Sequence, residues 1–127
     1  TGASGIGAIA ASATSTSVTN TIIWNCGSVP FGGSITFARS VVPVGTPGVG
    51  NVFTDPLFTA LSATNFRLSF LSPCIDAGSN SAFLAVAPLT TTDIAGTARF
   101  ADISSVPDTG EGTTPIIDIG AIEARCT

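Results

Sequence analysis

The stretch from residue 51 to residue 78, NVFTDPLFTALSATNFRLSFLSPCIDAG, combines turn residues with a strand pattern. Asp55-Pro56 predicts a turn, because proline fixes its own φ and pushes the preceding residue away from the helical region. Residues 65–70 alternate strictly between polar and apolar side chains, which is the period of a half-buried strand. Pro73 interrupts that run, and residues 74–78 predict a short strand or tight connection that ends on a glycine. We therefore expect a strand, a turn and a second strand here.

The flanking sequence carries the same type of pattern. Residues 15–25 and 34–42 are rich in β-branched side chains, and the Pro- and Gly-rich stretches 27–33 and 43–50 predict loops around the second of them. The segment 82–86 fits either a short helical turn or a strand. The sequence therefore predicts an almost all-β chain, with a core that draws on six apolar residues of these segments: Trp24, Phe37, Phe58, Phe66, Leu68 and Phe70.

Composition limits the classes of function. The chain has 127 residues, of which 44% are apolar and only 9% are charged, with a net charge of −4. This length predicts one domain, residues 1–127, and the apolar fraction is too high for a disordered chain. Lysine is absent and the four arginines are scattered, so no basic surface for nucleic acid is expected. No apolar run approaches the ~20 residues of a membrane-spanning helix.

The missing residue types also limit the chemistry. Histidine and lysine are both absent, which excludes a Ser-His-Asp triad, a Cys-His pair, an ordinary zinc site and a Schiff-base lysine. Eight carboxylates, four arginines and three cysteines remain. They allow hydrolysis by paired carboxylates, Ca²⁺-assisted lyase chemistry, or no catalysis at all.

Four separated motifs along the chain carry a family resemblance: DPLF, NFRLSFLSPCIDAG, TDIAGTARF and DIGAIE. In this order they resemble the C-terminal end of secreted bacterial right-handed parallel β-helix proteins, the surface proteins grouped as choice-of-anchor or pectate-lyase-like repeats. The resemblance runs from about Ser17 to Glu123, and Ile122 stands where the family pattern has an aromatic residue. It implies a short right-handed parallel β-helix, or β-solenoid, although the composition also fits a β-sandwich-like body.

The resemblance suggests a division of the domain into three parts. Residues 1–14 form an uncharged N-terminal strand or arm, residues 15–78 form β-helix coils, and residues 79–127 form the closing segment. The family motifs close the solenoid in those proteins, and many members are known only as surface proteins of undefined function. We therefore expect an extracellular or cell-surface location.

The charged residues of the two closing motifs predict a structural clasp. Arg99 can hold a carboxylate through its planar fork, and Glu123 or Asp118 is the expected partner. Such a pair would tie the last strand to the body of the domain. A catalytic acid pair and ordinary surface charge are the alternatives.

The acidic residues of the loop 102–113 raise the possibility of a calcium site. Asp102, Asp108 and Glu111 supply hard oxygen ligands beside Gly110 and Gly112, although their spacing is not that of an EF-hand. The alternative is a solvated surface loop, and no other cofactor is expected. Three further acids, Asp55, Asp76 and Asp93, lie beside turn residues and are expected to cap backbone turns.

Three cysteines allow one disulfide and one spare thiol, in a chain whose composition suggests an oxidising compartment. Cys74 and Cys126 both belong to motifs expected near the closing strand, so that pair is favoured over either pairing of Cys26. No histidine or lysine is present to activate a cysteine as a nucleophile.

Two classes of function fit these observations. The first is a non-enzymatic structural or adhesive surface protein, with itself as a homopolymer and cell-surface polysaccharide as expected partners. Its uncharged first strand, with Ile6 and Ile9, would add to a neighbour's sheet and give a head-to-tail filament. The alternative is a fragment of a carbohydrate-active β-helix enzyme, a polysaccharide lyase or hydrolase. Its acid pair would be Asp76 with Asp93, or Asp118 with Glu123.

Overall fold

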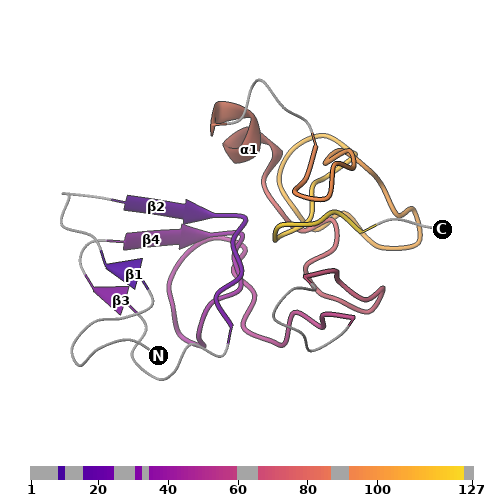
Figure 1. The fold of residues 1–127 in the computed structure, drawn as a ribbon. Helices are drawn as coiled ribbons and strands as arrows, with labels where there is room; N and C mark the ends of the chain where they lie inside the picture. Colours follow the sequence, from indigo (N-terminus) through magenta and orange to yellow (C-terminus); the bar gives the residue numbers. More distant parts are fainter. Residues whose placement is uncertain are drawn as a thin grey trace.

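The computed structural model describes residues 9–10, 16–24, 31–32, 35–59, 66–86 and 92–124. Strands and coil dominate this part of the chain (Figure 1). The elements are β1 (Ile9–Ala10), β2 (Thr16–Thr19), β3 (Phe31–Gly32), β4 (Ile35–Ala38) and α1 (Asn80–Val86). The expectation of little helix is confirmed, because the described chain is mostly strand and coil with parallel pairing, and the undecided segment 82–86 belongs to the helix.

Parallel pairing joins successive passes of the chain. β2 and β4 lie side by side (Figure 1), and each β2 residue pairs with the residue 19 positions later, from Thr16 with Ile35 to Thr19 with Ala38. The same pairing continues beyond the strands, because Ile22 bridges Val41, which bridges Val52 in turn. β1 and β3 form a second parallel pair. Three passes of the chain are therefore stacked at Val41.

The corner after each strand repeats as well. Asn20 follows β2 and Arg39 follows β4, and both adopt the left-handed region with φ of 57° and 48°. The Asn20 N–H donates to the Arg39 carbonyl at 3.1 Å, which keeps the two corners stacked. Asparagine tolerates this backbone conformation better than most residues. Two successive passes thus turn in the same way at the same point.

Alternating side chains divide the apolar interior into two clusters. Ile22 and Val41 pack into a cluster with Leu68, Cys74 and Ile119, among others. Their neighbours Ile23 and Val42 point the other way, into a smaller cluster with Phe37. This alternation is typical of an extended chain, because successive side chains lie on opposite faces.

The stretch 57–70 forms a short antiparallel pairing around Phe58 and Leu68. The Thr59 N–H donates to the Arg67 carbonyl and the Ser69 N–H to the Leu57 carbonyl, both at 2.8 Å. The predicted core positions Phe37 and Leu68 are buried, and Trp24 and Phe58 pack partly buried against the core.

The predictions that Phe66 and Phe70 are core residues are wrong. Phe66 is 46% exposed and Phe70 is 56% exposed. They flank residues 67–69, whose pairing the structure describes, and the chain already turns at Phe70, where the Ser72 N–H donates to the Ser69 carbonyl at 3.0 Å. Phe66 instead meets Phe58 edge to face, with ring centroids 6.1 Å apart.

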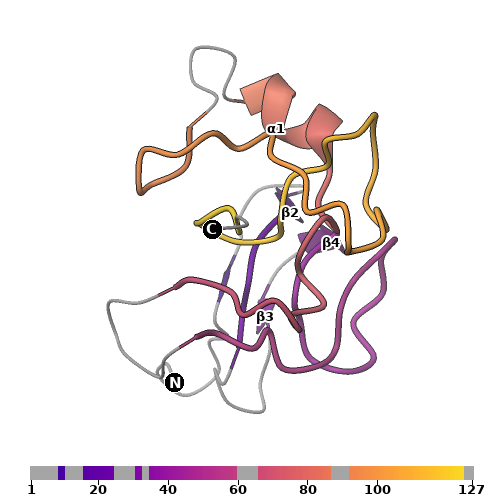
Figure 2. The same ribbon diagram turned by 90° about the vertical axis from the view of Figure 1, so that its right-hand side faces the viewer.

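The described residues of 72–124, which from here on we call the closing segment, lie against the ends of these passes, with α1 on the outside (Figures 1 and 2). Residues 74–80 lie between two later stretches: the Ile119 N–H donates to the Cys74 carbonyl at 2.9 Å, and Ser79 bridges Glu111 in parallel. The backbones approach so closely that a Cβ at Gly110 would collide with the Gly78 carbonyl oxygen. Among the described residues, no helix has the length and apolar character needed to cross a membrane.

Candidate functional site

The turn at 92–98 positions the first acid of the candidate site. Asp93 Oδ1 accepts hydrogen bonds from the Ala95 and Thr97 N–H groups at 2.8 and 2.9 Å, and the Thr97 hydroxyl donates to Oδ2. Gly96 closes the turn with φ of 83°, a conformation that glycine adopts readily. The prediction that Asp93 caps a turn is confirmed, as it is for Asp55, whose Oδ1 accepts from the Leu57 N–H at 2.8 Å.

This turn directs Arg99 into the protein, where it is 5% exposed. Its Nη1 donates to the Gly120 carbonyl at 2.9 Å and its Nη2 to the Asp118 carbonyl at 3.0 Å. Its Nε lies 3.7 Å from Glu123 Oε2, an ion pair without a hydrogen bond. Arg99 and Glu123 therefore meet, but the fork holds two backbone carbonyls of the last segment where the sequence predicted a bidentate carboxylate.

The Asp118 and Glu123 carboxylates bind backbone N–H groups. Asp118 Oδ1 accepts from the Asp76 N–H at 2.8 Å, and its Oδ2 accepts from the Ala124 N–H at 2.6 Å. Both oxygens of Glu123 accept from the Asp118 N–H at 3.2 Å, and the Glu123 N–H donates to Asp93 Oδ2 at 2.8 Å. The charged groups of three chain segments thus form one hydrogen-bonded cluster, which we call the carboxylate cluster: Asp93, Arg99, Asp118 and Glu123.

The environment of the cluster shifts the pKa values in two directions. Burial, followed by the nearby Asp118 charge, raises the pKa of Glu123 to about 9 despite Arg99. Burial likewise raises the pKa of Asp118 to about 6, against the hydrogen bonds from Ala124 and Asp76. Burial also acts on Asp93, but its hydrogen bonds outweigh that effect and its pKa is lowered. Arg99 carries one positive charge, whereas the carboxylate cluster contains three buried acidic side chains.

Asp76 lies beside this cluster and behaves differently. It is 1% exposed, and neither of its carboxylate oxygens has a hydrogen-bond partner. The expectation that its side chain caps a turn is therefore wrong. One carboxylate oxygen from each of Asp76, Asp102 and Asp108 lies within 4.8 Å of the others, and the latter two residues are exposed. We call these three residues the aspartate triad.

The triad corrects the predicted calcium ligands. Asp102 and Asp108 come together as expected, but Asp76 takes the place of Glu111. Glu111 Oε2 instead accepts hydrogen bonds from the Ser79 and Ser81 hydroxyls at 2.6 and 2.7 Å. Asp76 was missed because it is 26 positions from Asp102 in the sequence. The local signal that its backbone lies in a buried turn was its place between Ile75 and Ala77, two residues before Gly78.

Cys74 is a free cysteine without exposed area. Its N–H donates to the Ser72 hydroxyl at 3.1 Å, and burial raises the pKa of its thiol to about 11. The Cys74 side chain packs in the main apolar cluster, and the expected bridge to Cys126 stays a prediction. Cys126 and Cys26 lie outside the described residues. A buried thiol with a raised pKa is a poor nucleophile.

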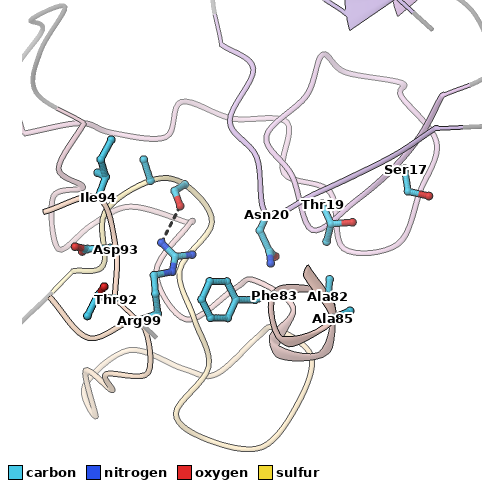
Figure 3. A pocket seen from close by; sticks show the side chains of 12 residues that line it. Ser17, Thr19, Asn20, Ala82, Phe83, Ala85, Thr92, Asp93, Ile94 and Arg99 are labelled. Carbon is cyan, nitrogen blue, oxygen red and sulfur yellow. Dashed lines mark hydrogen bonds between the residues drawn. The ribbon is translucent and has the colours of Figure 1, made fainter. Parts of the chain in front are cut away.

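Two clefts share Asn20, Gly120 and Ala121 in their linings, and the first also contacts the carboxylate cluster. One, of about 620 Å³, is lined by Asn20, Phe83, Asp93 and Arg99, among others. Figure 3 shows Phe83 between Arg99 and Asn20, and the guanidinium carbon lies 5.5 Å from the centre of the Phe83 ring. The second cleft, of about 590 Å³, has an aromatic lining from Trp24, Phe58 and Phe66. Neither cleft brings two free carboxylates together.

The predicted assembly strand is described in part. Ile9 belongs to β1, which pairs with β3 of the same chain in a two-stranded sheet, so one edge of β1 is covered within the protein. Ile6 lies outside the described residues, as does most of the expected arm 1–14. In the part of the chain that the structure describes, the second edge of β1 carries no strand.

Comparison with known proteins adds nothing to this geometry: no protein family, no curated protein and no solved structure matches the chain.

Proposed function

We propose that this chain is a non-enzymatic structural module of an extracellular or cell-surface protein, in which stacked β-coils are closed by a segment that internal charges hold in place. The observation that carries the proposal is the use of the carboxylates. Asp93, Asp118 and Glu123 all accept backbone N–H groups, and Arg99 donates to backbone carbonyls. Groups used in this way position the chain and are not free to bind a substrate.

The parallel pairing supports the finer proposal of a short right-handed parallel β-helix. A constant offset of 19 residues between β2 and β4, repeated at Ile22 and Val41, is what stacked coils produce. A connection between parallel strands of one sheet is right-handed in about 98% of cases. The stacked corners at Asn20 and Arg39 fit the same geometry.

Self-assembly through the N-terminal strand is the second part of the proposal. An edge strand offers unpaired N–H and C=O groups to another chain, and charged side chains normally blunt such edges. Residues 1–38 contain no charge. Addition of β1 to the sheet of a neighbouring copy would give a head-to-tail filament, because the two surfaces that meet are different.

Electron microscopy and sedimentation of the full chain test the assembly. We expect fibres from the full chain, monomers from a chain without residues 1–14, and monomers from Ile9→Lys, which places a charge in the edge strand. A monomeric full chain with the same sedimentation coefficient as both variants would rule the filament out. A folded Ile9→Lys variant that still forms fibres would exclude this strand as the contact.

Turnover assays separate the proposal from the carbohydrate-active alternative. The alternative requires an acid pair open to substrate, whereas Asp76, Asp118 and Glu123 are each 1% exposed. We expect no new reducing ends and no unsaturated uronate from neutral or acidic polysaccharides. Turnover that Asp118→Asn abolishes without unfolding the protein would favour the enzyme. Binding of polysaccharide without turnover can be followed through Trp24, the only tryptophan.

A further inference from the structure

The backbone of Asp76 is hydrogen-bonded, whereas its side chain is not. Its N–H donates to Asp118 Oδ1, and its carbonyl accepts from the Thr109 and Gly110 N–H groups, both at 3.0 Å. Its carboxylate, in contrast, is fully enclosed and has no hydrogen-bond partner. A buried carboxylate without a partner is costly, so such a group in a native structure points to a ligand that completes it.

Two exposed acids face this carboxylate. Asp108 directly precedes Thr109 and Gly110, whose N–H groups donate to the Asp76 carbonyl. These two hydrogen bonds hold the backbone next to Asp108 against Asp76. Asp102 directly precedes Ile103, which is buried in the main apolar cluster. The three carboxylates converge to within 4.8 Å, whereas like charges normally repel one another.

The charges that act most strongly on the Asp76 carboxylate are those of other aspartates. Arg39, whose Nη1 donates to the Thr109 carbonyl at 2.7 Å, binds the backbone beside Asp108. Burial, and then Asp118, Asp102 and Asp108, raise the pKa of Asp76 to about 7, and the Ile103 backbone N–H, whose geometry is not that of a hydrogen bond to this carboxylate, lowers it.

We propose that the aspartate triad of Asp76, Asp102 and Asp108 binds a calcium ion. Ca²⁺ prefers carboxylate oxygens at about 2.3–2.6 Å, so two oxygens on opposite sides of the ion are about 4.6–5.2 Å apart. The triad oxygens, all within 4.8 Å of one another, fit around one such ion with little movement. Mg²⁺ requires near-ideal octahedral geometry at about 2.0–2.1 Å and usually binds through one or two carboxylates, so three converging carboxylates favour Ca²⁺.

The bound ion would join parts of the closing segment that are distant in sequence. Asp76 belongs to the stretch that pairs with residues 117–119, and Asp102 and Asp108 flank the turn at Ile103, whose carbonyl accepts from the Val106 N–H at 2.7 Å. Calcium would hold this exposed loop against the buried backbone. With only three protein carboxylates, we expect an affinity of about 10⁻⁴–10⁻³ M, as in extracellular modules.

Thermal unfolding of the full chain at pH 8, in chelator and with rising CaCl₂, tests the site. At ten times the dissociation constant, the folding equilibrium constant increases about 11-fold. This corresponds to a rise of about 4–8 °C in melting temperature for a chain of this length. MgCl₂ at the same concentration should give a clearly smaller rise. Isothermal titration with CaCl₂ should give one site per chain.

Four variants locate the site. Asp102→Asn and Asp108→Asn alter exposed residues, so both should fold and bind Ca²⁺ at least tenfold more weakly. Asp76→Asn removes the buried charge, and we expect a higher melting temperature in chelator together with loss of the calcium response. Glu111→Gln makes the same change of charge at an exposed acid outside the triad and should keep the response.

Three results would overturn the assignment. The first is a wild-type melting temperature that does not respond to 10 mM CaCl₂ at pH 8, which would mean that a proton and not a cation neutralises Asp76. The second is a calcium response that survives in both Asp102→Asn and Asp108→Asn. The third is equal loss of the response in Glu111→Gln and in the triad variants, which would indicate binding by general negative charge.

Discussion

The stacked coils at 16–52 and the closing segment at 72–124 are stabilised in different ways. In the coils, backbone groups pair with backbone groups, and Ile22, Val41 and Val52 stack in a ladder. In the closing segment, carboxylates and one guanidinium take the place of strand partners for buried N–H and C=O groups. The coils therefore need regular spacing, whereas the closing segment needs particular charged residues in particular places.

The difference has an energetic consequence. A regular ladder distributes its stability over many hydrogen bonds and apolar contacts, each worth about 1 kcal/mol or less. Removing one member of a buried charged network leaves its partners unsatisfied and costs considerably more. Substitutions in the closing segment should therefore have the larger effects, and the following predictions begin with the largest.

Replacement of Arg99 should give the greatest loss. Arg99→Ala leaves the Asp118 and Gly120 carbonyls and the Glu123 carboxylate without a buried partner, and we expect a decrease of about 2–4 kcal/mol in the free energy of unfolding. Arg39→Ala, in the coils, removes one exposed hydrogen bond to Thr109 and should cost less than about 1 kcal/mol. Urea unfolding of both variants measures the contrast. Equal losses would remove the distinction between the two regions.

A methyl group at Gly110 should be almost as damaging. The added Cβ collides with the Gly78 carbonyl oxygen and with Ile116, so backbone must move and we expect a loss of about 2–3 kcal/mol. The matched control is Gly45→Ala in the coils, where a Cβ meets nothing within 4 Å and only the positive φ opposes alanine, at about 1 kcal/mol. Similar melting temperatures for the two variants would show that the close approach of residues 78 and 110 is absent.

Stability should fall as the pH rises. Glu123 is faced by Arg99, Asp118, Asp76 and the Asp93 carboxylate, and its pKa is raised from 4.5 to about 9. A raised pKa contributes stability that is complete below pH 4.5 and is lost as the pH rises through about 9. Since one pKa unit corresponds to about 1.4 kcal/mol, we expect a loss of about 2 kcal/mol or more between pH 5 and pH 9.

The matched variant for this prediction is Glu123→Gln, which cannot ionise but can still accept the Asp118 N–H. Its stability should change less over the same range, as measured by urea unfolding at each pH. Below pH 4, both proteins should weaken, because the lowered pKa of Asp93 contributes stability that is lost as that carboxylate protonates. A wild-type protein that becomes more stable between pH 5 and pH 9 would contradict the raised pKa.

The smallest predicted effect concerns the junction of the two regions. Asn20 Oδ1 accepts from the Ser79 N–H at 2.6 Å and its Nδ2 donates to the Ser79 carbonyl at 2.9 Å, as a paired strand would. Asn20→Gly keeps the left-handed backbone accessible and removes both bonds, which should cost about 1–2 kcal/mol.

The control for this junction is Asn51→Ala, because the Asn51 side chain bonds only within the coils, to Ser40, Phe37 and Pro47. Hydrogen exchange should accelerate in the closing segment of Asn20→Gly and in the coils of Asn51→Ala. The same pattern of exchange in both variants would show that Asn20 does not join the regions.

The sequence predicted those features that depend on local patterns. Alternation and β-branched residues indicated extended chain at 16–19 and 35–38, and the turns at Asp55 and Asp93 followed from their neighbours. The meeting of Arg99 with Glu123 was also expected, from two motifs that resemble a closing segment. The alternation at 65–70 wrongly predicted that Phe66 and Phe70 are buried, because a period of two does not show whether another segment covers that face.

The details of the site could not be predicted, because they depend on contacts between distant segments. The residues next to Asp76 and Asp55 indicate turns at both positions, but they do not show that the first carboxylate is buried without a partner while the second caps an exposed turn. The fork of Arg99 binds carbonyls because the last segment folds around it, and the Cys74 side chain packs in the main apolar cluster. Each of these outcomes requires the tertiary structure.

Amide hydrogen exchange by NMR tests the central claim most directly, since the claim is that carboxylates serve as backbone partners in the closing segment. The N–H groups of Asp118, Glu123 and Ala124 donate to carboxylate oxygens, whereas those of Ile23, Val42 and Val52 donate to backbone carbonyls of the coils. We predict protection factors in the first group within about tenfold of those in the second, and loss of protection in the first group alone in Arg99→Ala. Exchange of the Asp118, Glu123 and Ala124 amides at the rate of exposed loops in the wild-type protein would contradict the account.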